Sequence, residues 1–117
     1  MIAYRFLQPA EEEMIEAAQF YEAAASGLGR DFLDDLQHGI NHLHQHPNLG
    51  HSVAHSLRRL LLHRFPFSLI YSVDIEGVLI VAVAHHGRRP GYWKNRVRTN
   101  SAAHESGKVN SSRERSG

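Results

Sequence analysis

The sequence contains no cysteine, which excludes a disulfide framework, a thiolate metal site and a cysteine nucleophile. Long apolar runs are also missing, because the longest, Val78–Ala84, falls far short of the roughly 20 residues that span a bilayer. Residues 1–8 lack the apolar core and the small-residue cleavage site of a signal peptide. These absences predict a cytoplasmic protein without a membrane segment.

Lysine is scarce, so arginine carries most of the positive charge, and that charge is unevenly distributed. Residues 1–50 hold eight acidic and two basic side chains, a net charge of −6, whereas residues 51–100 hold eight basic and two acidic ones, a net charge of +6. This division favours an acidic or polyanionic partner for the second half. Attraction between the two halves of the chain would also explain it, and the sequence leaves that alternative open.

The hydrophobic period changes near the middle of the chain. Residues 9–25 and 29–46 repeat apolar side chains at helical spacing and are joined by a few residues, which predicts an antiparallel helical hairpin. Strands are expected before the hairpin and three times after it, over residues 2–7, 57–63, 67–73 and 78–85. The order β-α-α-β-β-β predicts an α+β fold of two layers, with the helical hairpin packed on an antiparallel sheet.

The composition becomes polar after Trp93, where Ser, Asn, Gly, Arg and Glu dominate. We therefore predict a single domain over residues 1–97 and a disordered polar tail over residues 98–117.

Two segments of the second half carry the most specific pattern. The first reads R-R-L-L-L-H-R-F-P-F-S-L-I-Y over residues 58–71, and the second reads A-V-A-H-H-G-R-R-P-G-Y-W over residues 82–93. In this order, and on the predicted elements, they resemble the RelE/ParE superfamily of toxins from type II toxin–antitoxin modules, often labelled plasmid-stabilisation proteins. The resemblance covers about residues 2–96.

The resemblance implies one of two activities. RelE-like members are endoribonucleases that cut mRNA on the ribosome, whereas ParE-like members inhibit DNA gyrase and lack a nuclease constellation. We predict a metal-free RelE-type endoribonuclease, with a ParE-type gyrase inhibitor or a degenerate antitoxin-binding module without toxicity as alternatives. The implied partners are a cognate antitoxin and either mRNA on the ribosome or DNA gyrase. No cofactor is expected.

Metal-free RNA cleavage needs groups that transfer protons and cations that stabilise the charged phosphorane. Within the quoted segments, His85 is the candidate for proton transfer, and Arg64 and Arg88 are candidates for phosphate binding. Tyr92 is a candidate for stacking on a base or relaying a proton. Arg64 precedes one predicted strand and His85 finishes its antiparallel neighbour, so both are expected at one end of the sheet.

A structural interpretation of the same residues stands beside the catalytic one. In it, His85 and His86 cap a strand, Arg64 and Arg88 pair with the acidic helices, and Tyr92 belongs to a C-terminal lid over the core. The nuclease prediction is further weakened by the chain's two lysines, because RelE-type sites are rich in Lys and Arg. The remaining basic residues of the region are predicted to bind nucleic acid: Arg58, Arg59, Arg89 and Lys94.

Three histidines, His38, His42 and His46, recur four residues apart on the second predicted helix. That spacing suits a metal ion, but the residues lie opposite the apolar stripe and no carboxylate completes an H-E-x-x-H motif. The sequence therefore favours a solvated polar face, and no metal site is predicted.

Overall fold

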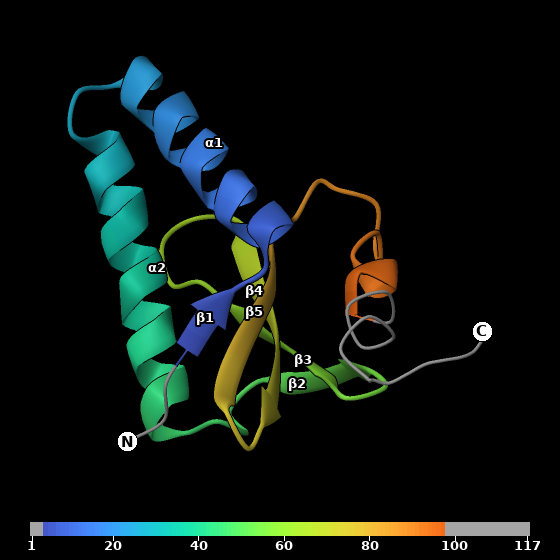
Figure 1. Ribbon diagram of the computed structural model, residues 1–117. Helices are drawn as coiled ribbons and strands as arrows, with labels where there is room; N and C mark the ends of the chain where they lie inside the picture. Colours follow the sequence, from blue (N-terminus) through green and yellow to red (C-terminus); the bar gives the residue numbers. More distant parts are fainter. Residues whose placement is uncertain (1–3, 98–117) are drawn as a thin grey trace.

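The computed structural model describes residues 4–97, in which seven helices and strands follow one another along the chain (Figure 1). In chain order they are β1 (Tyr4–Phe6), α1 (Gln8–Ala24), α2 (Leu28–Gln45), β2 (His51–Ala54), β3 (Leu57–Leu61), β4 (Phe67–Asp74) and β5 (Gly77–His85). A short helical turn over residues 94–97 ends the described part. The predicted tail over residues 98–117 lies outside the described residues.

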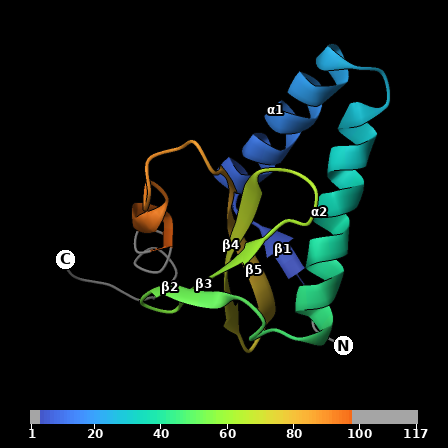
Figure 2. The same ribbon diagram turned by 180° about the vertical axis from the view of Figure 1, so that it is seen from behind.

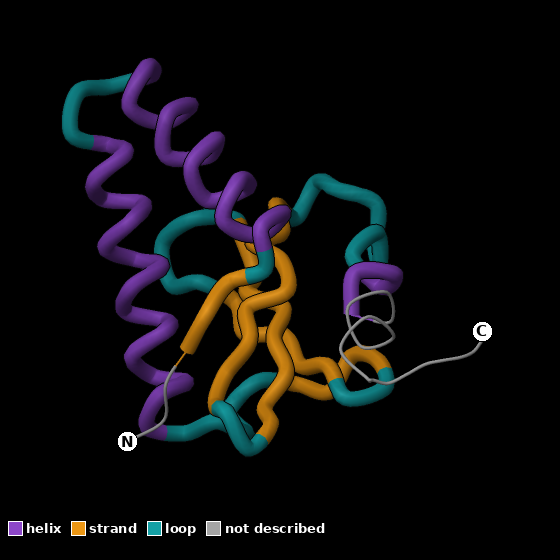
Figure 3. Tube along the Cα trace, in the orientation of Figure 1, coloured by secondary structure: helices purple, strands orange, loops and turns teal. Residues whose placement is uncertain are grey.

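The strands form one mixed sheet in the order β1-β5-β4-β3-β2. β1 runs parallel to β5, and the other neighbours are antiparallel. Figures 1 and 3 show α1 and α2 on one side of the sheet and the C-terminal helical turn on the other, and the view from behind in Figure 2 agrees. The predicted two-layer α+β fold with a helical hairpin packed on a sheet is confirmed. The sheet was expected to be antiparallel, and it is mixed, because β1 joins β5 in parallel.

The strand β2, a short strand at the edge of the sheet, was not predicted from the sequence. Its four residues are exposed or half-buried, so they carry no strong alternation of apolar and polar side chains. β2 pairs with β3 in the register His51↔Arg59 and Ser52↔Arg58. The observed order is therefore β-α-α-β-β-β-β.

The helical hairpin is tight because a carboxylate of α1 caps the start of α2. The Glu22 carboxylate accepts the backbone N–H groups of Gly27 and Gly29 at 3.0–3.1 Å. Gly27 has a φ of +86°, a left-handed conformation that glycine adopts without strain. Gly29 lies so close to α1 that a Cβ there would sit 2.6 Å from the carbonyl oxygen of Ala18.

The two central strands, β4 and β5, are buried on both faces. On the helical face, the apolar stripe of α2 packs against alternate residues of the sheet, among them Phe32, Leu36, Leu69 and Ile80. On the opposite face, Trp93 and its neighbours cover a second cluster of sheet side chains, among them Ile70, Val81, Ala82 and Ala84. The C-terminal segment therefore completes the core, and it also forms one wall of the site described next.

No helix in the part of the chain that the structure describes is long and apolar enough to cross a membrane.

Candidate functional site

A hollow of about 570 Å³ lies on the sheet face opposite the helices, between β3–β5 and the segment that follows β5. We call it the basic hollow, because four cationic side chains line it: Arg59 of β3, and Arg88, Arg89 and Lys94 of the segment that follows β5. Ser68, His86 and Trp93 also contribute to its lining. The arrangement suits a ligand with negative charge.

His86 points into this hollow, where it meets a buried hydroxyl. Ser68 pairs with Ala84 across β4 and β5, and His86, two residues further on, projects to the same face. The Ser68 hydroxyl is 3.0 Å from Nε2 of His86, and Ser68 is only 2% exposed. The backbone N–H of His86 donates to the carbonyl oxygen of Pro66 at 2.9 Å, which fixes the strand end.

The neighbouring His85 has its ring on the other face of the sheet. It pairs with Phe67, and the two rings pack edge to face with centroids 5.0 Å apart. The Gly87 N–H donates to Nδ1 of His85 at 2.8 Å. His85 borders both the basic hollow and an apolar hollow of about 330 Å³ between α1 and β5, where Phe20 is 69% exposed.

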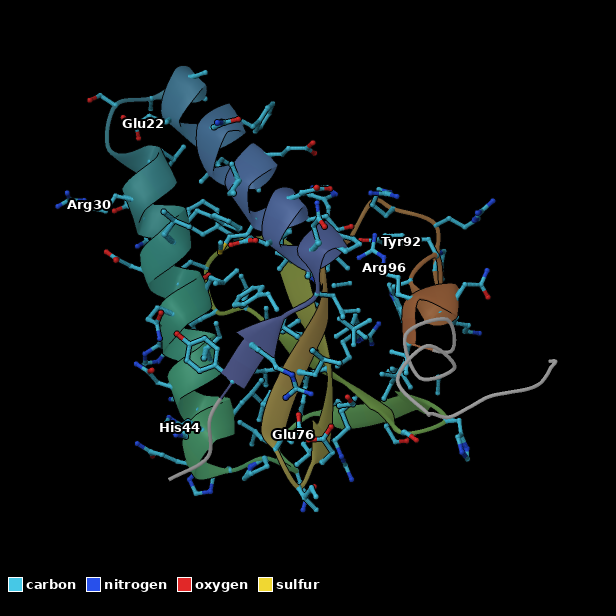
Figure 4. All side chains as sticks on the ribbon, viewed as in Figure 1. Glu22, Arg30, His44, Glu76, Tyr92 and Arg96 are labelled. Atoms are coloured by element: carbon cyan, nitrogen blue, oxygen red, sulfur yellow. The ribbon has the colours of Figure 1, made fainter. Side chains whose placement is uncertain are left out.

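Three side chains of the C-terminal segment contact Glu13 of α1. Two of them, Tyr92 and Arg96, are labelled in Figure 4. The Glu13 carboxylate accepts hydrogen bonds from the Tyr92 hydroxyl at 2.7 Å and from Arg96 at 2.8 and 3.0 Å. The Val83 N–H donates to it at 3.0 Å. Arg88 lies 3.9 Å from the same carboxylate, and its guanidinium stacks 3.9 Å from the centre of the Tyr92 ring.

These contacts shift the pKa values of Glu13 and Tyr92. Burial alone would raise the pKa of Glu13, but hydrogen bonds from Arg96, Tyr92 and the Val83 N–H, with the charge of Arg96, outweigh it and lower the pKa below 4.5. Burial raises the pKa of Tyr92, and the hydrogen bond to Glu13 and the charge of Glu13 raise it further. The Tyr92 hydroxyl is thus held in its protonated form as a donor to Glu13.

Arg64 lies away from both hollows, beside the helices. Its guanidinium is 3.7 Å from the carboxylate of Asp31 and 5.7 Å from the centre of the Phe65 ring. The backbone N–H groups of Arg64 and Phe65 both donate to Asp35, at 2.8 and 3.0 Å. Arg64 and Arg88 therefore make the ion pairs with the helices that the structural interpretation expected.

Arg58 is turned toward the connection between α2 and β2. Its guanidinium donates to the carbonyl oxygen of Gly50 at 2.7 Å and, at 3.4 Å, to that of Asn48. Of the four basic residues predicted to bind nucleic acid, the structure therefore brings three to the basic hollow, while Arg58 supports a loop.

The candidate catalytic residues are spread over three places. Arg88 and Tyr92 lie together at the rim of the basic hollow, His85 turns its ring toward the helical face, and Arg64 contacts α2. Sequence reasoning missed His86 and Ser68, although strand alternation from Ala84 would have put them on one face. It also missed Glu13, which is separated from Tyr92 by 79 positions and carries no local signal.

No group of three or more His, Asp or Glu side chains in residues 4–97 is arranged to hold a metal ion. The exposed histidines of α2 do lie on its solvent face, as the sequence predicted.

Comparison with known proteins gives a family match and a structural match that agree. Residues 4–90 match the model of the family described as "ParE toxin of type II toxin-antitoxin system, parDE". The fold is similar to that of a solved structure titled "Chromosomal ParDE TA system from P. aeruginosa", with a TM-score of 0.62 and 21% identity over 73% of this chain and 96% of that chain. At this identity the structural likeness shows the fold alone. No curated protein matches the chain.

Proposed function

Because this chain belongs to the ParE toxin family of type II toxin–antitoxin systems, we propose that it arrests growth by binding its target and not by cutting RNA. The family implies a cognate antitoxin as partner. For the target, we propose DNA gyrase, which the resemblance to ParE-like proteins implies.

The proposal is supported chiefly by one observation: most of the candidate catalytic side chains contact acidic residues of the helices. Metal-free RNA cleavage needs a base, an acid and cations that converge on one phosphate. Here the Tyr92 hydroxyl and the guanidinium of Arg88 are directed at Glu13, and Arg64 pairs with Asp31. These contacts favour a structural role for the three side chains.

The basic hollow is the proposed contact surface for acidic side chains of the target or of the antitoxin. Arg59, Arg89 and Lys94 are exposed, and they face one space without an acidic residue in its lining. Electrostatic complementarity of this kind speeds association and selects partners.

RNA cleavage stays a second candidate because of one observation, the contact between His86 and Ser68 beside these cations. Imidazole next to a cluster of guanidinium groups is the chemistry that a metal-free ribonuclease uses.

The test is induced expression with growth, mRNA integrity and plasmid supercoiling followed together. We expect growth arrest with intact mRNA and altered supercoiling, both for the native chain and for His86→Ala. Reversing charge in the hollow with Arg59→Glu plus Arg89→Glu should relieve the arrest, whereas Arg30→Glu, an exposed arginine on α2, should not. Cleaved mRNA that is restored by His86→Ala would replace the proposal with the nuclease.

A further inference from the structure

The solvent face of α2 carries two imidazole rings that lie against each other. His38 and His42 are exposed, and their ring centroids are 4.5 Å apart with an angle of 49° between the ring planes. Both residues lie inside the helix Leu28–Gln45, one turn apart. We propose that His38 and His42 chelate one divalent transition metal ion, of the class that includes Cu²⁺, Ni²⁺ and Zn²⁺.

The distance between the rings fits a shared ion. Imidazole nitrogen binds Zn²⁺ at about 2.0–2.1 Å, so two rings on one tetrahedral ion have centroids about 5 Å apart. The observed centroid distance of 4.5 Å is close to this value, and exposed histidines rotate freely about their side-chain bonds. The helix holds the two Cα atoms in place, so little order has to be created when the ion binds.

The surroundings leave room for the remaining ligands. A hollow of about 240 Å³ separates α2 from the end of β3, and His38, His42, Asp35 and His63 line it. One carboxylate oxygen of Asp35 already accepts two backbone N–H groups. In the proposed site, His38 and His42 supply the two protein ligands and water completes the coordination.

The neighbouring His46 is excluded from the pair by the backbone. It is four residues beyond His42, but it caps the helix with φ −136° and ψ 77°, outside the helical conformation. The site therefore uses the first two histidines of the series. The sequence alone favoured a solvated polar face here, and the contact between the rings is the observation that changes that interpretation.

The test is titration of the full-length, tag-free chain with CuCl₂, NiCl₂, ZnCl₂ or MgCl₂, followed by calorimetry and by melting temperature. We expect one ion per chain, tighter binding of Cu²⁺ than of Ni²⁺, and no binding of Mg²⁺, in line with the preference of imidazole. Binding to the folded chain should raise the melting temperature.

Matched variants identify the ligands. His38→Gln and His42→Gln should each weaken binding at least about tenfold, while His46→Gln and His51→Gln, which replace other exposed histidines, should stay within about twofold. All four should keep the melting temperature of the native chain without metal. Equal losses in all four variants, or a loss with His46→Gln but not with His38→Gln, would overturn the proposal. None of these outcomes depends on whether the chain inhibits gyrase.

Discussion

Glu13 is the residue on which most of the C-terminal segment depends. Its side chain is 14% exposed and accepts hydrogen bonds from Tyr92, Arg96 and the Val83 N–H. Replacing it by Ala would leave Arg96, itself only 20% exposed, without its counter-ion. We expect Glu13→Ala to lower the free energy of unfolding by about 2–4 kcal/mol, because the half-buried Tyr92 hydroxyl, Arg96 and the Val83 N–H lose their shared acceptor.

Urea denaturation measures this change, and Glu12→Ala is the matched control. Glu12 is exposed and its carboxylate bonds only the side chain of Gln8, so its loss should cost less than about 0.5 kcal/mol. Similar losses from the two substitutions would show that the Glu13 contacts contribute little.

The lowered pKa of Glu13 makes stability depend on pH. Because the pKa is lower in the folded chain than in the unfolded one, the ionised carboxylate stabilises the fold above its ordinary pKa of 4.5, and this contribution is lost as the pH falls through the folded pKa. The stability gap between the native chain and Glu13→Gln should therefore narrow from neutral pH to about pH 3. Urea midpoints at several pH values measure the gap; a constant gap would contradict the assignment.

At the scale of elements, the contact between the two helices depends on Gly29. A Cβ at this position would meet the backbone oxygen of Ala18 at 2.6 Å, so one helix has to move. We expect Gly29→Ala to destabilise the protein by about 1–3 kcal/mol.

Gly39→Ala is the matched control on the same helix. Its Cβ would meet the side-chain ends of Leu62 and Leu69 at 3.3 and 3.4 Å, which can adjust, and alanine favours the helix by about 1 kcal/mol. Melting curves of the two variants should therefore differ, with Gly39→Ala close to the native chain. Equal melting temperatures of the two variants would mean that the helices can move apart at Gly29 without a loss of stability.

A buried hydroxyl, together with the Arg58 guanidinium, holds the connection from α2 to β2. The Tyr71 hydroxyl donates to the carbonyl oxygen of Pro47 at 2.9 Å and accepts the Gly50 N–H at 2.8 Å. Tyr71→Phe leaves both backbone groups unpaired, so we expect a loss of about 1–2 kcal/mol and faster amide exchange at Gly50. Unchanged exchange at Gly50 would mean that water replaces the hydroxyl.

The sequence predicted the long elements well, because each has a clear period and definite ends. Pro9 falls in the first turn of α1, and the apolar alternation of β4 marks which residues face the helices. It could not predict β2, whose pairing depends on β3 and not on its own side chains. Short edge strands are stabilised by the neighbour that they join.

The site was predicted less fully than the fold. The structure brings Arg59, Arg89 and Lys94 of the predicted segments to the basic hollow, and their role in binding stays a prediction. The candidate for proton transfer was His85 and not His86, because the motif was followed and the sheet face that each ring would occupy was not considered. The links from Glu13 to Tyr92 and Arg96 span about 80 positions, and only the folded chain brings them together.

At the scale of the whole molecule, the positive charge of the second half is found in two places, in ion pairs with the helices and on an exposed surface. Some of it is used internally, between the arginines of the second half and the acidic residues of α1 and α2, as in Arg96 with Glu13 and Arg64 with Asp31. The rest remains exposed in the basic hollow, on the face away from the helices. Attraction between the two halves of the chain therefore accounts for the paired arginines, while a negatively charged partner for the exposed ones stays a prediction.

The most direct test of the central claim is a pair of reactions with the purified chain. One measures DNA supercoiling by gyrase, and the other measures cleavage of mRNA on translating ribosomes, each over the same range of toxin concentrations. Binding without cleavage predicts that supercoiling is inhibited while the mRNA stays intact. Cleaved mRNA with gyrase unaffected would contradict the account and would assign the basic hollow to RNA.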